Sequence, residues 1–141
     1  MVELKVNEIK FVAHSLAQKL MKFSEPIPDF STRYPAILES CLNTPFQRYA
    51  NKDVYKGFTL KAAMLFYLMI KNHPFQNGNK RVAIMTLLYF LSKNNKWLEV
   101  DTKELYNFSV WVAESPADLK DEVVAAIVKK FKKYIISLQI K

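Results

Sequence analysis

The sequence of 141 residues has little glycine, proline or cysteine, and each shortage excludes a kind of protein. With two glycines, six prolines and no stretch rich in serine or glutamine, it leaves no room for a flexible linker or a low-complexity tail. Its single cysteine, Cys41, cannot form an intramolecular disulfide. Because the N-terminal residues also lack the basic and then apolar layout of a secretory signal, we expect a protein of the reducing cytoplasm.

Long apolar runs are missing as well. The longest, Ala62–Ile70, is about half of the ~20 residues that a membrane-spanning helix needs, so we expect no transmembrane segment and no membrane partner. Half of all residues are nonetheless hydrophobic. A chain of this length can bury roughly two thirds of its unfolded surface, and a single domain over residues 1–141 is expected.

Acidic residues are outnumbered by basic ones, 13 to 21, which leaves a net charge of +8. This surplus suits a nucleic acid, an acidic protein or a phosphorylated small molecule. Four of the lysines lie within residues 129–133, interleaved with apolar residues, which is typical of the solvated face of an amphipathic helix. Trp97 and Trp111 follow core-like spacing and form no stacking platform, so a nucleic-acid partner is not expected.

Apolar residues spaced three and four apart predict helices, which prolines and capping residues bound. We expect about six, over approximately residues 9–23, 35–42, 60–71, 78–93, 102–113 and from 115 onward. Thr59 is the expected cap of the third, and Ser115 followed by Pro116 is expected to open the last. Residues 44–56 lack a clear period and are expected to form a loop or small hairpin. The predicted fold class is therefore all-α, a compact helical bundle.

The nine residues His73–Arg81, HPFQNGNKR, join the two central helices and gather polar groups in an apolar setting. A helix start has unpaired N–H groups and a partial positive charge, so anions bind there. Lys80 and Arg81 lie in this first turn, where cations are unfavourable unless an anion offsets them. Gly78 would let a ligand approach the backbone, and the Asn79 amide can donate to phosphate oxygens. This loop is a predicted phosphate site.

His73 stands at the end of the first central helix, where it can take a proton from a hydroxyl near that phosphate. A lone histidine at a helix end is more commonly a capping or surface residue. Phe75 is expected to anchor the loop to the core. The neighbouring residues favour the chemical role for His73.

This stretch resembles the signature of the Fic/Doc family, H-P-F-x-[D/E]-G-N-[G/K]-R. The chain matches it at His73, Pro74, Phe75, Gly78, Asn79, Lys80 and Arg81. Members of the family are all-α, with the motif between two central helices, in agreement with the helical pattern above.

The resemblance implies an enzyme that transfers part of a nucleotide, or its phosphate, to a serine, threonine or tyrosine hydroxyl of a target protein. His73 would be its general base. Four residues would hold the phosphates of ATP or another nucleoside triphosphate: Gly78, Asn79, Lys80 and Arg81. Mg²⁺ would be the metal cofactor.

The resemblance also implies how a target and a regulator would bind. The loop Thr44–Tyr55 matches in position the family's flap, which docks the target by strand-like pairing, with Phe46 as its apolar clamp. No glutamate here follows the pattern [S/T]-x-x-x-E-[G/N] of the family's inhibitory helix. Control by a separate antitoxin protein is expected, through a segment that folds on binding.

Lys80 indicates the branch of the family. Most members that transfer AMP have a second glycine there, whereas the Doc branch has lysine, transfers the γ-phosphate and acts on elongation factor Tu. The sequence therefore favours a Doc-like toxin kinase that arrests translation. Gly78 is Fic-like, since Doc itself has alanine, and an AMP transferase is the alternative.

Asn77 stands where the family has the Asp or Glu that binds Mg²⁺. An amide oxygen supplies the geometry of that ligand without its charge. Asn77 is therefore a weaker metal ligand, and a catalytically weak nucleotide-binding or partner-binding module is a further alternative.

Overall fold

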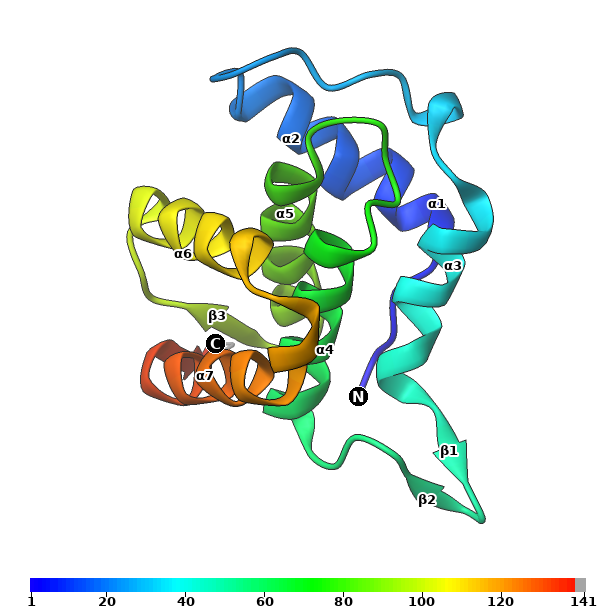
Figure 1. The fold of residues 1–141 in the computed structure, drawn as a ribbon, viewed down its shortest axis with the longest axis vertical. Coiled ribbons are helices and arrows are strands. Elements are labelled where there is room, and N and C mark those ends of the chain that lie inside the picture. The colour runs from blue at the N-terminus through cyan, green and yellow to red at the C-terminus, as the bar shows by residue number, and fades with distance from the viewer. Residues whose placement is uncertain (139–141) are drawn as a thin grey trace.

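The computed structural model describes residues 1–138, which are mostly helical (Figure 1). The first helix is continuous and comprises α1 (Val6–Glu8), a π-helical turn η1 (Ile9–His14) and α2 (Ser15–Leu20). The others are α3 (Pro35–Asn43), α4 (Phe58–Lys71), α5 (Asn79–Lys93), α6 (Thr102–Glu114) and α7 (Lys120–Tyr134). With the first three segments taken as one, six main helices form within residues 1–138, and the predicted all-α class is confirmed.

Helices α4 and α5 form the centre of the molecule, with α1 to α3 on one side of the pair and α6 and α7 on the other (Figure 1). Every residue from Lys61 to Ile70 is buried, as expected of a helix that is apolar almost all the way round. Helix α4 begins before the predicted cap Thr59. Its N-cap is Gly57, whose φ of 88° ends the preceding loop in a conformation that glycine adopts without steric cost.

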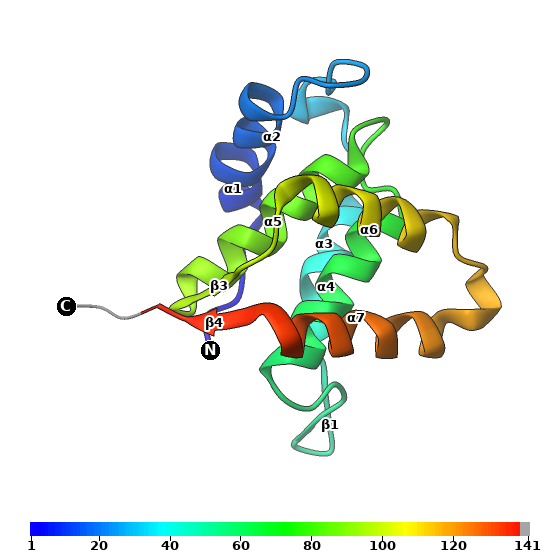
Figure 2. The ribbon, with the colours of Figure 1, turned by 90° about the vertical axis from the view of Figure 1, so that its left-hand side faces the viewer.

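Two pairs of short strands accompany the helices. The first, β1 (Arg48–Tyr49) with β2 (Lys52–Asp53), is the small hairpin expected within residues 44–56, and the positive φ of Ala50 and Asn51 is typical of its two-residue turn. The second, β3 (Lys96–Leu98) with β4 (Ile135–Ser137), was not predicted (Figure 2). Strands of three residues, far apart in the sequence, have no local periodicity that would reveal them.

The last helix also begins later than predicted. Ser115 does not cap it, because the Ser115 hydroxyl donates to the Val112 carbonyl at the end of α6. Pro116 is extended, with a ψ of 141°, and a 3₁₀ turn, η4 (Ala117–Leu119), precedes α7. The pair Ser115–Pro116 therefore connects two helices. Among residues 1–138, we find no helix with the length and apolar character needed to span a membrane.

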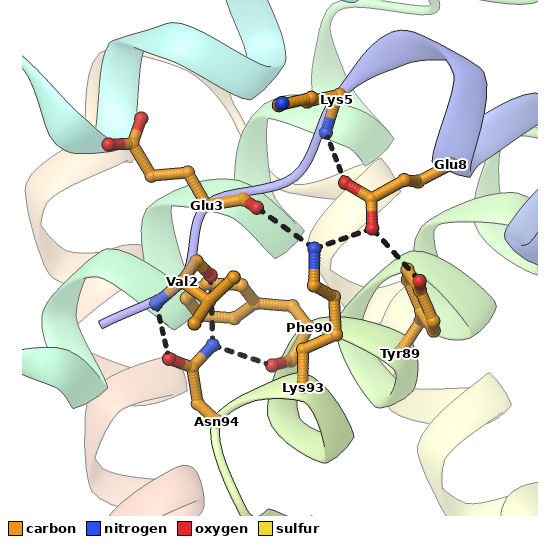
Figure 3. Close-up of polar contacts among 8 residues, drawn as sticks. All are labelled: Val2, Glu3, Lys5, Glu8, Tyr89, Phe90, Lys93 and Asn94. Carbon is orange, nitrogen blue, oxygen red and sulfur yellow. Dashed lines mark hydrogen bonds and ion pairs between the residues drawn. The ribbon is translucent and has the colours of Figure 1, made fainter.

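The N-terminal residues are fastened to the end of α5 (Figure 3). The side-chain amide of Asn94 accepts from the N–H of Val2 and donates to the Val2 carbonyl. The Tyr89 hydroxyl and the Lys93 ammonium both donate to Oε2 of Glu8. Burial raises the pKa of Glu8, but the hydrogen bonds from Lys93 and Tyr89 outweigh it and hold this pKa below its usual value. These contacts fix the first helix against α5.

Candidate active site

A cavity of about 260 Å³ lies at the start of α5. Most of its wall is the loop between α4 and α5, from His73 to Arg81. Ser24, from the segment after α2, completes one side, and Tyr106 and Ala113 of α6 complete another. Three elements that are distant in sequence therefore meet around the predicted motif.

The motif loop is anchored at its first residues. The carbonyl of Pro74 accepts the N–H of Tyr34 at 2.9 Å. Phe75 is buried, with its ring 5.2 Å from that of His14 and 5.9 Å from that of Phe30. The expected anchoring role of Phe75 is confirmed.

Asn79 closes the loop on itself. Its Oδ1 accepts the N–H of Phe75 at 2.9 Å, and its Nδ2 donates to the Phe75 carbonyl at the same distance. Nδ2 also lies 3.4 Å from Nδ1 of His73. The buried amide of Asn79 thus holds the loop and its histidine in place, and its predicted donation to phosphate oxygens stays a prediction.

His73 is exposed beside the cavity, with a φ of 51° that turns the chain sharply after α4. Because an amide NH₂ group only donates, the contact with Asn79 requires an unprotonated Nδ1 on His73. At 3.4 Å this hydrogen bond is long. An unprotonated ring nitrogen of this kind is what a proton acceptor needs.

Gly78 is the N-cap of α5 and has a φ of 79°. A Cβ at this position would lie 2.6 Å from Cγ1 of Ile27, inside van der Waals contact. The glycine therefore admits the segment that follows α2, and its predicted role of letting a ligand approach the backbone stays a prediction. The approach of Ile27 could not be inferred from local pattern.

The first turn of α5 offers anion-binding groups. Within residues 1–138, the backbone N–H groups of Asn79, Lys80 and Arg81 donate to no backbone carbonyl, as is usual at a helix start. Among the same residues, the ammonium of Lys80 forms no ion pair with a carboxylate. A phosphate at the cavity would meet N–H groups, a positive helix end and the Lys80 charge.

Arg81 makes contacts that the sequence did not predict. It is buried, at 3% exposure, and its guanidinium donates to three backbone carbonyls. Nη1 donates to Met21 and Phe23, both at 3.0 Å, and Nη2 donates to Glu25 at 2.7 Å. In this structure Arg81 holds the segment after α2 against α5, and its predicted contact with phosphate stays a prediction.

Asn77, the predicted metal ligand, contacts a carboxylate. Its Oδ1 accepts the N–H of Gly78 at 2.8 Å, and its Nδ2 donates to Oε2 of Glu25 at 3.2 Å. Residues 1–138 contain no group of three or more His, Cys, Asp or Glu side chains arranged for a metal. Mg²⁺, however, commonly takes one or two carboxylates together with substrate phosphates and water. Glu25, hydrogen-bonded to the Asn77 side chain that lines the cavity, is one carboxylate of that kind.

The predicted flap, the loop Thr44–Tyr55, lies away from the cavity. The hairpin β1–β2 precedes α4 and the motif loop follows it, so the two stand at opposite ends of a 14-residue helix that is about 21 Å long (Figure 1). Phe46 packs edge-on against Phe90, with 5.7 Å between ring centroids, and does not line the cavity. The structure therefore does not bring the loop Thr44–Tyr55 or its proposed clamp to His73, because α4 separates them.

The sequence pattern predicted no role for two side chains that make clear contacts in the structure. Lys61, buried in α4, donates to the Asp53 carboxylate at 3.1 Å and to the Tyr55 carbonyl, which ties the hairpin to the helix. A single cation inside an apolar helix was the available signal. Glu25 had no local signal, since only folding brings it to Asn77.

The Fic/DOC family model matches residues 4–91, which is more than half of the chain and includes the whole motif loop. No curated protein and no solved structure matches the chain.

Proposed function

The chain belongs to the Fic/DOC family, and from this premise we propose that it transfers the γ-phosphate of ATP, or of another nucleoside triphosphate, to a hydroxyl of a target protein. Members of this family are in general nucleotidyl or phosphate transferases. The supporting observation is that His73 and the open start of α5 line one cavity. A ligand in this cavity would therefore be within reach of both the His73 imidazole and the N–H groups of that helix start.

The transfer needs few groups. The target oxygen forms a bond to the γ-phosphorus, the bond from that phosphorus to the β–γ bridging oxygen breaks, and the nucleoside diphosphate leaves. His73 takes the proton of the attacking hydroxyl. The N–H groups at the start of α5 and the Lys80 ammonium hold the phosphates and offset their charge. Mg²⁺, when bound, supplies further neutralisation of the phosphate oxygens.

Lys80 is the reason to propose phosphate transfer, because lysine at this motif position is the feature shared with the Doc branch. The alternative is AMP transfer, in which the hydroxyl attacks the α-phosphorus and pyrophosphate leaves. Gly78 favours that alternative in the motif comparison. Asn77 supports a third possibility, a module that binds nucleotide or a partner with little turnover.

A target must reach the cavity near His73. The segment Pro26–Asp29, which has no regular secondary structure, lies beside the motif loop, where Ile27 packs on Gly78. We propose that this segment, rather than the β1–β2 hairpin, pairs with the target backbone. From the resemblance to the Doc branch of the family, the proposed target is a translation factor such as elongation factor Tu. The proposed regulator is a separate antitoxin protein.

Intact-mass spectrometry of elongation factor Tu, after incubation with the protein, ATP and Mg²⁺, tests this proposal. Addition of one phosphate that requires His73 supports the kinase, and addition of one AMP supports the alternative. Addition by Asn77→Asp alone would identify an intact scaffold with a weak metal site. If neither the natural chain nor Asn77→Asp modifies the factor, that target is wrong.

A further inference from the structure

The five residues that follow α2, Met21 to Glu25, touch the motif at two points. The guanidinium of Arg81 donates to the carbonyls of this segment, and the Glu25 carboxylate accepts from the amide of Asn77. These contacts bring together residues that are 52 and 56 positions apart in the sequence. The segment is part of the cavity wall, because Ser24 lines it.

The backbone of Glu25 is held firmly at this place. Its own carbonyl accepts the shortest of the three Arg81 hydrogen bonds, at 2.7 Å. The residue before it, Ser24, has a φ of 71°, a left-handed conformation that non-glycine residues adopt at a cost. A buried cation and a strained residue therefore act together to fix the point from which the Glu25 side chain extends.

The Glu25 carboxylate lies next to Asn77, the motif position at which this chain lacks an acidic residue. Oε2 of Glu25 lies 3.2 Å from Nδ2 of Asn77, the residue that replaces the family's metal-binding acid. The only side-chain oxygen of Asn77, Oδ1, is engaged by the N–H of Gly78. Among residues 1–138, Glu25 is the one carboxylate that forms a hydrogen bond or ion pair with a side chain of the motif loop.

We infer that Glu25 supplies the carboxylate ligand for the Mg²⁺ that accompanies the nucleotide, and that Arg81 is the positioning residue that holds it there. This inference rests on the proposed function, since it concerns the same cavity. A hard divalent cation prefers a charged oxygen to an amide oxygen. Glu25 provides that charge from outside the motif, while Asn77 binds the carboxylate through its NH₂ group and orients it.

Calorimetry with a non-hydrolysable ATP analogue, with and without Mg²⁺, measures the contribution of the metal to nucleotide affinity. In Glu25→Gln, the gain in affinity on adding Mg²⁺ is expected to fall by at least about tenfold, with affinity in the absence of metal retained. Glu39→Gln, which changes another exposed glutamate, is the matched control and should keep the full gain. In the double variant Glu25→Gln/Asn77→Asp, the aspartate at position 77 should recover the gain in nucleotide affinity on adding Mg²⁺.

The positioning role of Arg81 has its own test. Arg81→Lys keeps the charge but cannot make the same three hydrogen bonds, so the gain on adding Mg²⁺ should fall. Adding Asn77→Asp to this variant should restore the gain, because the carboxylate then comes from the loop itself. A merely structural role for Arg81 predicts no such rescue.

Other outcomes would overturn the inference. An unchanged Mg²⁺ effect in Glu25→Gln would show that Glu25 is not a ligand, and tighter binding of the Mg²⁺–nucleotide would show that the carboxylate competes with the phosphates. If the natural chain binds no nucleotide with or without metal, the proposed function itself fails and the inference falls with it.

Discussion

Replacing Gly78 by alanine tests the packing on which the cavity depends. The new Cβ would meet Ile27, with distances of 2.6 Å to Cγ1, 3.1 Å to Cδ1 and 3.3 Å to Cγ2. Ile27 is buried and belongs to the core, so it has little freedom to move away. The substitution should therefore strain both the backbone of the motif loop and the segment after α2.

Two contributions set the size of the effect. A side chain in the left-handed conformation costs about 1 to 2 kcal/mol. Inserting a methyl group into a packed core costs about 1 to 3 kcal/mol more. Gly78→Ala should therefore lower the free energy of unfolding by about 2 to 5 kcal/mol, and lower the melting temperature by roughly 6 to 20 °C.

Urea denaturation of a double-mutant cycle with Ile27→Ala isolates the steric part. Removing all three contacting atoms should reduce the cost of Gly78→Ala by about 1 to 3 kcal/mol. Gly57→Ala is the matched control, because Gly57 also has a positive φ, 88°, but a Cβ there meets nothing within 4 Å. Gly57→Ala should lower the free energy of unfolding by the same amount in the natural chain and in the Ile27→Ala variant.

An equal loss of unfolding free energy from Gly78→Ala with and without Ile27 would contradict this steric contact. Additive effects would mean that the segment after α2 does not press against Gly78 in solution, and that the glycine serves only the backbone conformation. The proposed position of Glu25 would then lose part of its support.

Three further predictions concern other parts of the chain. His73→Ala should reduce transfer activity by about 10²- to 10⁴-fold while the melting temperature stays near that of the natural chain, because His73 is exposed; a large loss of stability would contradict its catalytic role. Lys61→Met should speed amide hydrogen exchange in the β1–β2 hairpin, since it removes the ammonium that holds Asp53 and the Tyr55 carbonyl; unchanged exchange would show that the hairpin is fixed by other contacts. Burial lowers the pKa of His14, so the unfolded chain binds the proton more readily and stability should fall as the pH drops below about 6.5. His14→Leu should flatten this dependence in urea titrations between about pH 7.5 and 5.5, and a dependence unaffected by the substitution would assign it to another group.

The central part of the fold was predictable from local pattern. Continuous apolar character identified α4 as the central helix within two residues of its start, because burial on all sides leaves few polar positions. The motif His73–Arg81 was placed correctly between α4 and α5. Predictions failed where contacts join distant residues, as in the pairing of β3 with β4.

The sequence by itself determined the helical class, the two central helices and the motif between them, because helix periodicity and loop chemistry depend on neighbouring residues. Only the tertiary structure decided what those motif residues contact. It turned Arg81 toward three carbonyls, placed Ile27 against Gly78 and brought Glu25 to Asn77. These contacts join residues more than 50 positions apart, and they exist because the first helix packs along α5 and carries the segment after it to the cavity.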